Sequence, residues 1–225
     1  MRRLLLAALL ACSPFATAQP AAPSAKPPAA KAPPAIVRVK LTTTDGVIVL
    51  ELDRAKAPIS VDNFVQYVKD KHYDGTIFHR VIPGFMAQGG GYTPQFKEKP
   101  TRKPIKLEVG KGLSNERGTI AMAREPSPDT ATSQFFINVV NNGRSGPAGP
   151  LSLDTRGGGY AVFGRVVEGM EVVDSIVGIP TGPGGPFPKD VPFRNAVITK
   201  AELLPPARVV PPSPPADKPA PAKTP

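Results

Sequence analysis

The segment FHRVIPGFMAQGGG (residues 78–91) sets one arginine, Arg80, among apolar side chains and follows it with an amide side chain, Gln88. A guanidinium carries five N–H donors and remains charged at any working pH. Such a group is either one partner of a structural salt bridge or the hydrogen-bond donor of a site. Phe85 and Met86 of the same segment, taken alone, are typical core residues, so the segment by itself leaves both interpretations open.

The rest of the chain supplies few other reactive groups. The two histidines are His72 and His79 and the one cysteine is Cys12, so counting excludes a His/Cys metal site in the core, and no metal or cofactor is expected. No serine lies in a nucleophile elbow, and no Lys-Ser/Thr signature follows the glycines at 89–91, which indicate a bulge or a close backbone approach. One arginine among apolar and amide side chains suits a reaction that breaks no σ-bond and moves no net proton.

Short β-type runs must position these side chains. The alternating run at residues 36–53 brackets Asp-Gly at 45–46, a strong hairpin signal. Ser60 is suited to cap a helix at 61–71, and a second helix is expected at 169–178. The other predicted strands are TIFHRVI, FMAQGG, GTIAMA, SQFFINVV, AVFGRVV and NAVITKAELL. Many short strands with two helices predict a mainly β fold, a closed or nearly closed barrel capped by helices.

Composition divides the chain into a core and two proline-rich tails. Residues 19–35 hold six prolines and residues 206–225 hold eight, and both segments are expected to be disordered because they cannot bury enough apolar surface. Residues 36–205 form the expected single domain. The core carries 21 basic and 17 acidic residues, so the overall net charge of +10 comes mainly from outside it and no nucleic-acid partner is expected. The basic run at 97–106 is interpreted as a solvated loop.

The N-terminus has the layout of a secretory signal peptide, residues 1–18. Two arginines precede the apolar run LLLAALLA, and the small residues ATA supply a cleavage site after Ala18. The run is too short to span a membrane, and no integral membrane segment is expected later in the chain. An alternative is a lipoprotein signal that makes Cys12 the acylated first residue, but Leu10 is less usual in that motif. The chain is therefore expected in the periplasm, or else as a membrane-anchored lipoprotein.

Four segments resemble, in order, the motifs of the cyclophilin family of peptidyl-prolyl cis-trans isomerases. The segments are FHRVIPGFMAQGG (78–90), GTIAMAR (118–124), SQFFIN (133–138) and YAVFGRV (160–166). The resemblance covers about residues 36–205, and the signal peptide and the motif at Tyr160 are most similar to the bacterial periplasmic branch. It implies a closed eight-stranded antiparallel β-barrel capped by two α-helices, with the site on the outer face.

The resemblance also implies a role for each matching residue. Arg80 takes the catalytic position, donating a hydrogen bond to the prolyl nitrogen of an X-Pro bond. The implied substrate-binding residues are Phe85, Met86, Phe136 and Leu153 as walls of the proline pocket, Gln88 and Gln134 as amides that bind the substrate backbone, and Ala123, Arg124 and Tyr160 around the neighbouring subsite. The implied substrates are X-Pro bonds in unfolded or loop segments of exported proteins. The alternative is a proline-peptide binding or chaperone module, with incidental isomerase activity.

Three positions depart from the family pattern. Arg124 stands where the family usually has asparagine, and the change is expected to be tolerated because that contact is largely made by main chain. Tyr160 takes a place often held by histidine. Ser152 stands where many members have tryptophan, so cyclosporin is expected to bind weakly while isomerisation is mostly retained. The chain is expected to be a monomer.

Overall fold

The computed structural model of the chain describes residues 34–111, 113–147 and 152–205. The signal peptide expected at 1–18, most of the linker expected at 19–35 and the tail expected at 206–225 lie outside these residues. Within them, the helices are all too short or too polar to cross a lipid bilayer.

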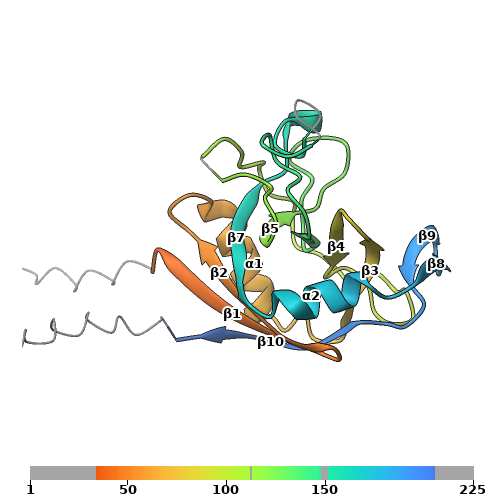
Figure 1. Cartoon of the computed structure of the whole chain (residues 1–225). Helices are drawn as coiled ribbons and strands as arrows, with labels where there is room; N and C mark the ends of the chain where they lie inside the picture. Colours follow the sequence, from red (N-terminus) through yellow and green to blue (C-terminus); the bar gives the residue numbers. More distant parts are fainter. Residues whose placement is uncertain (1–33, 112, 148–151, 206–225) are drawn as a thin grey trace, which may run out of the picture. The chain divides into compact units, whose positions relative to one another are not determined.

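Eight antiparallel strands close into a barrel in the order β1-β10-β3-β4-β6-β5-β7-β2, which confirms the predicted fold class (Figure 1). The strands of the barrel are β1 (Ile36–Thr43), β2 (Gly46–Asp53), β3 (Thr76–Ile82), β4 (Met86–Gly89), β5 (Thr119–Met122), β6 (Phe135–Asn138), β7 (Val162–Glu168) and β10 (Val197–Leu204). Since β1 pairs with β10, the first and last strands of the domain lie side by side. The barrel is therefore closed by the two ends of the domain.

The hairpin between β1 and β2 forms as predicted, but its turn lies one residue earlier than the Asp-Gly signal indicated. The turn residues are Thr44 and Asp45, and Gly46 is already the first residue of β2, paired with Thr43. The Thr43 hydroxyl closes the turn, accepting from the Asp45 N–H at 3.1 Å and donating to the Gly46 carbonyl at 2.8 Å. A Cβ on Gly46 would lie 2.7 Å from a methyl of Val172, so glycine is needed for a close approach to the second helix.

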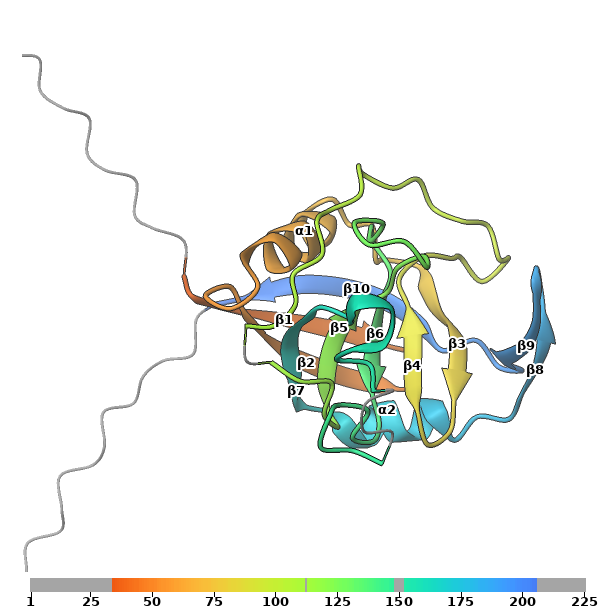
Figure 2. The same cartoon turned by 90° about the horizontal axis from the view of Figure 1, so that it is seen from above.

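Helices α1 (Pro58–Lys69) and α2 (Met170–Val177) cover opposite openings of the barrel (Figure 2). The prediction that Ser60 caps α1 is wrong, because the helix begins at Pro58 and Ser60 lies inside its first turn. The buried Glu108 carboxylate satisfies this end of the helix instead, accepting from the Ser60 N–H at 2.7 Å and from its hydroxyl at 3.0 Å.

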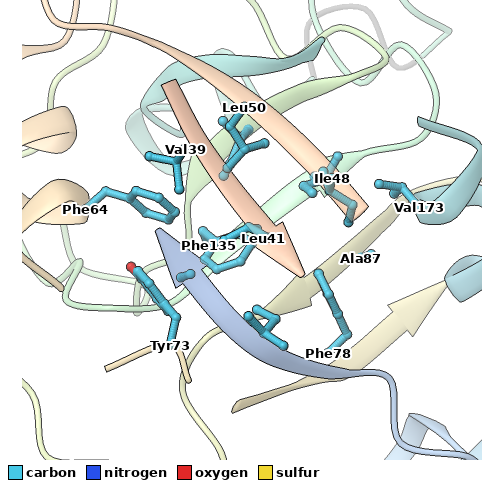
Figure 3. Close-up of a cluster of buried hydrophobic side chains, with 14 of the residues drawn as sticks. Val39, Leu41, Ile48, Leu50, Phe64, Tyr73, Phe78, Ala87, Phe135 and Val173 are labelled. Carbon is cyan, nitrogen blue, oxygen red and sulfur yellow. The ribbon is translucent and has the colours of Figure 1, made fainter. Parts of the chain in front are cut away.

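The main core fills the barrel and the inner face of α1 (Figure 3). Phe64 of α1 packs its ring 4.8 Å from Tyr73 and 5.5 Å from Phe135, and Phe78 adds a fourth ring 6.1 Å from Phe135. A second, smaller apolar cluster is separate from this core. It comprises the buried residues Met86, Ala121, Phe136, Leu153 and Val162.

A bulge in β3 decides which way Arg80 points. Phe78 pairs with Gly89 but Arg80 pairs with Gln88, so His79 is an extra residue in β3. Without the bulge, Phe78 and Arg80 would share one face of the strand, because side chains alternate with a period of two. With it, Phe78 remains in the main core and Arg80 turns to the outer face of the barrel.

A two-stranded sheet, β8 (Thr181–Gly184) and β9 (Phe187–Pro192), lies beside β3 and was not predicted. Its sequence, TGPGGPFPKDVP, contains the residues that most disfavour strands. The contact with β3 is aromatic. The Phe187 ring stacks on the His79 ring at 5.3 Å, and Tyr92 meets both rings at their edges.

Candidate active site

A hollow of about 260 Å³ on the outer face of the barrel collects the predicted site residues. Every predicted residue except Gln134 lines it. The lining residues are Arg80, Phe85, Met86, Gln88, Ala123, Arg124, Phe136, Leu153, Arg156 and Tyr160. Residues up to 80 positions apart in the sequence meet here. The strands β3, β4 and β6 are neighbours in the barrel, and Tyr160, ahead of β7, packs its ring on Phe136 of β6.

One wall of the hollow is apolar. Met86 from β4, Phe136 from β6 and Leu153 pack together there, and all three are at least nine-tenths buried. Phe85, at the turn between β3 and β4, packs against them. The wall belongs to the smaller apolar cluster rather than to the main core, so it can receive a small apolar ring without opening the barrel.

A chain of hydrogen-bonded polar side chains extends from the hollow. Gln88 links its two ends, accepting from Nη1 of Arg80 at 3.4 Å and donating to Oε1 of Gln134 at 3.0 Å. Gly91 allows Gln134 this position, since a Cβ on Gly91 would lie 2.7 Å from the Gln134 side chain. The side chain of Arg80 is 41% exposed, and its Nε lies 3.7 Å from Asp190, an ion-pair distance longer than a hydrogen bond. Arg80 therefore does have an acidic neighbour, as the salt-bridge interpretation requires. That contact still leaves Nη2 without a hydrogen bond to any described residue.

The rim of the hollow is held by Arg124. Its guanidinium donates to the carbonyls of Gly157 and Gly159 and lies 4.6 Å above the ring of Tyr160. Tyr160 in turn meets the edge of the Phe136 ring at 5.7 Å. The arginine that replaces the expected asparagine therefore fastens the loop carrying the short helix η2 (Arg156–Gly158) against the site.

Two residues near the site were missed in the sequence. Arg156 lines the hollow from η2, exposed and without a side-chain partner in the described part of the chain. Asp190 reaches Arg80 from β9. Both lie in glycine- and proline-rich stretches with no periodicity. The one signal that the sequence offers for them is an isolated charged residue within such a stretch.

Ser152, which stands where many family members have tryptophan, does not line the hollow. The residue is 1% exposed, and its hydroxyl lies 3.4 Å from the hydroxyl of Thr155. Its carbonyl accepts from the N–H groups of Thr155 and Arg156. Ser152 is thus a turn residue rather than part of a ligand-binding surface.

His79 is not available as an acid or base near neutral pH. Burial lowers its pKa from an ordinary 6.5 to about 4, and the ring is packed between Tyr92 and Phe187. The neutral ring therefore supports the back of the site through packing.

The stability of the domain should fall on mild acidification because of His79. Between about pH 6.5 and pH 4 the unfolded chain binds a proton that the folded chain does not, which costs at most about 3 kcal/mol at 1.36 kcal/mol per pKa unit. Urea unfolding at about pH 7 and about pH 4.5 measures this loss. In His79→Gln the loss should shrink clearly. An unchanged loss would mean that other groups, such as His72, carry the pH dependence.

The remaining charged groups indicate no further chemistry. Within the described ranges, His, Cys, Asp and Glu nowhere gather in threes that could hold a metal ion. In the basic run at 97–106, Lys99 donates to the carbonyls of His72 and Asp74, and Arg102 pairs with Asp70 at 3.0 Å. These basic groups thus serve local structure.

Comparisons with known proteins agree with this geometry. Residues 38–203 match the family described as "Cyclophilin type peptidyl-prolyl cis-trans isomerase/CLD". The chain is 52% identical over 166 residues to peptidyl-prolyl cis-trans isomerase A of Dickeya dadantii, covering 74% of this chain and 84% of that protein. It is 49% identical over 160 residues to peptidyl-prolyl cis-trans isomerase B of Escherichia coli, covering 71% and 95%.

A solved structure has the same fold. It is a cyclophilin type peptidyl-prolyl cis-trans isomerase of Cryptosporidium parvum, crystallised in the presence of the dipeptide Ala-Pro. The TM-score is 0.60 at 25% sequence identity, over 75% of this chain and 99% of that one.

Proposed function

This chain belongs to the cyclophilin type peptidyl-prolyl cis-trans isomerases and is an enzyme of that class. We propose that Arg80 is its catalytic residue and that its substrates are X-Pro bonds of exported proteins. The observation that carries the proposal is the pairing of an exposed guanidinium with an apolar hollow. Arg80 lines the hollow together with Met86, Phe136 and Leu153, and none of the described residues that line it is acidic.

The chemistry of the X-Pro bond explains why an arginine suffices. Rotation about the bond faces a barrier of about 18–20 kcal/mol because the nitrogen lone pair is delocalised into the carbonyl. A hydrogen bond donated to the prolyl nitrogen competes for that lone pair and weakens the partial double bond. Arg80 can donate it and remain charged throughout. Catalysis then comes from binding the twisted amide better than either planar form.

The remaining lining residues have roles that suit this step. The apolar wall of Phe85, Met86, Phe136 and Leu153 holds the proline ring still while the preceding carbonyl turns. It also keeps water from competing for the guanidinium. Gln88 and Gln134 offer amide groups to the substrate backbone, and Ala123 leaves room for the neighbouring residue. The structure of the similar Cryptosporidium parvum protein was determined in the presence of a proline-containing dipeptide, Ala-Pro, which is in keeping with a proline-containing ligand.

Exchange NMR on a short X-Pro peptide tests the activity in this chain directly. We expect the folded domain to broaden and merge the cis and trans resonances at substoichiometric amounts, because uncatalysed exchange takes tens of seconds or more. Peptide binding without accelerated exchange would favour the alternative, a proline-peptide binding or chaperone module. Full complementation of a deletion strain by Arg80→Ala would favour the same alternative.

Export is proposed from the sequence, since residues 1–18 lie outside the described residues. The mature protein's N-terminus decides the route. Mass spectrometry of the processed protein should find it beginning at Gln19 if it is a periplasmic protein cleaved after Ala18. A diacylated chain beginning at Cys12 would establish the lipoprotein, and an intact N-terminus in the cytoplasm would contradict export.

Cyclosporin should inhibit this enzyme weakly. The expected tryptophan is replaced by Ser152, which is buried in a turn and presents no ring to a ligand. Inhibition of turnover across a cyclosporin titration measures the effect, with a tryptophan-bearing family member assayed in parallel. Submicromolar inhibition of this chain would contradict the prediction.

The charge around the hollow should favour an acidic residue before proline. Three arginines line it, and Arg156 is the one without a side-chain partner in the described part of the chain. In a peptide series, kcat/KM for Glu-Pro should exceed that for Lys-Pro by about threefold to tenfold at low salt, and salt should reduce the ratio.

Replacing Arg156 should remove most of that preference. Arg156→Gln should bring the Glu-Pro to Lys-Pro ratio close to one, while Arg144→Gln should leave it unchanged. Arg144 is a suitable control because it is exposed nearby but does not line the hollow. If the Glu-Pro to Lys-Pro ratio of kcat/KM is unchanged in Arg156→Gln, the preference for an acidic residue comes from Arg80 and Arg124 instead.

A further inference from the structure

We propose that Asp190 is a positioning residue for Arg80, holding the guanidinium at Nε while Gln88 holds it at Nη1. The Asp190 carboxylate lies 3.7 Å from Nε of Arg80, and Gln88 lies 3.4 Å from Nη1. The inference rests on the proposed function, because it gives Asp190 its role through the catalytic arginine.

The two contacts divide the guanidinium into a held side and a free side. Nη1 donates to Gln88 and Nε lies within ion-pair distance of Asp190, whereas Nη2 donates no hydrogen bond to a described residue. The contacts at Nε and Nη1 therefore fix the direction in which Nη2 can donate. A guanidinium that is fixed in this way loses less rotational freedom when it meets the twisted amide. Its side chain would otherwise sample several rotamers, because Arg80 is 41% exposed.

Asp190 has no competing ion pair in the described part of the chain. Its carboxylate is 21% exposed, and Arg80 is the cation it meets there. The neighbouring exposed Lys189 makes no ion pair with it in the same ranges. Asp190 does not line the hollow, so it is placed to contact the arginine rather than a ligand in the hollow.

The backbone at Asp190 is strained. Its φ is +66°, in the left-handed region that a side chain adopts at a cost of about 1–2 kcal/mol and that glycine adopts freely. A non-glycine residue in this conformation is over-determined by its surroundings and often marks a functional position. From this conformation the carboxylate lies 3.7 Å from Arg80, although β9 belongs to a different sheet.

The small sheet that carries Asp190 is fixed to the strand that carries Arg80. Phe187 of β9 stacks on His79, the residue preceding Arg80, and Val191 beside Asp190 is buried. The bulge at His79 and the β8–β9 sheet thus act together. The bulge turns Arg80 outward, and the sheet places a carboxylate where the arginine emerges.

The experiment is a double-mutant cycle on kcat. Asp190→Asn keeps the shape of the side chain and tolerates the left-handed backbone, and removes the charge. We expect kcat to fall about fivefold to tenfold with KM nearly unchanged, and Asp190→Glu to recover part of the loss. In an Arg80→Lys background, which lacks the Nε contact, the same Asp190→Asn change should alter kcat less than about twofold.

A second variant and a control separate positioning from folding. Asp190→Gly relieves the backbone strain, so it should melt no lower than wild type and still lose kcat. Asp129→Asn is the matched control, because Asp129 also has a left-handed backbone, with φ of +58°, and pairs with Lys106 at 3.5 Å away from the hollow. Its kcat should equal that of wild type.

Two outcomes would overturn the inference. One is an Asp190→Asn enzyme with wild-type kcat, and the other is an equal loss in the wild-type and Arg80→Lys backgrounds. Failure of the proposed function looks different, because Arg80→Ala would then keep wild-type turnover whatever stands at position 190.

Discussion

Replacing Arg80 by alanine should lower kcat/KM for a short X-Pro peptide by about two to three orders of magnitude, the loss typical of removing one charge-stabilising donor. The change removes the charged donor that β3 contributes to the lining of the hollow. The neutral amide of Gln88, 3.4 Å from Nη1 of Arg80, cannot supply a charged donor in its place. Because Arg80 is 41% exposed and in no core cluster, the variant should fold normally. Exchange NMR line shapes and a protease-coupled assay measure both the loss and its partition between kcat and KM.

A matched arginine elsewhere on the barrel provides the control. Arg165 on β7 is also exposed and paired with a carboxylate, Glu51, at 3.4 Å, but lies outside the hollow. Arg165→Ala should retain wild-type turnover. A loss of less than about fivefold in Arg80→Ala would contradict the catalytic role and return the arginine to the structural interpretation.

Two neighbouring phenylalanines in β6 should respond in opposite ways to the same change. Phe135 is fully buried in the main core, where its ring meets Phe64, Tyr73 and Phe78. Phe135→Ala should therefore lower the free energy of unfolding by about 3–5 kcal/mol, through lost burial and the cavity left behind. Urea unfolding followed by circular dichroism measures it.

Phe136→Ala should instead lose activity. Its ring faces the hollow and belongs to the smaller cluster with Met86 and Leu153, so the proline ring loses one wall. We expect KM to rise and kcat/KM to fall by about tenfold or more, with a smaller loss of stability than in Phe135→Ala. Similar stability losses in both variants would show that the two clusters form a single core.

The sequence alone predicted the fold class and most of the residues that line the hollow. Strand runs such as TIFHRVI and SQFFINVV are rich in β-branched and aromatic residues, a local property, and they contain β3 and β6 of the structure. The four ordered motifs then indicated the family, and with it the residues that gather in the hollow around Arg80 and Phe136. A motif specifies residue types at a fixed spacing. Most residues that line the hollow belong to the four motif segments.

Only the tertiary structure decided how the site is aimed and held. The extra residue at His79 turns the Arg80 side chain to the outer face of the barrel. Such a bulge depends on the pairing with strand β4 and not on the sequence of β3 alone. The Glu108 carboxylate that satisfies the start of α1 is 48 residues away from Ser60, so no local capping signal could reveal it. Asp190 meets Arg80 across 110 residues, from a proline- and glycine-rich strand that propensity argues against. Propensity and period report on neighbours in the chain, whereas these three contacts arise from neighbours in space that only barrel closure brings together.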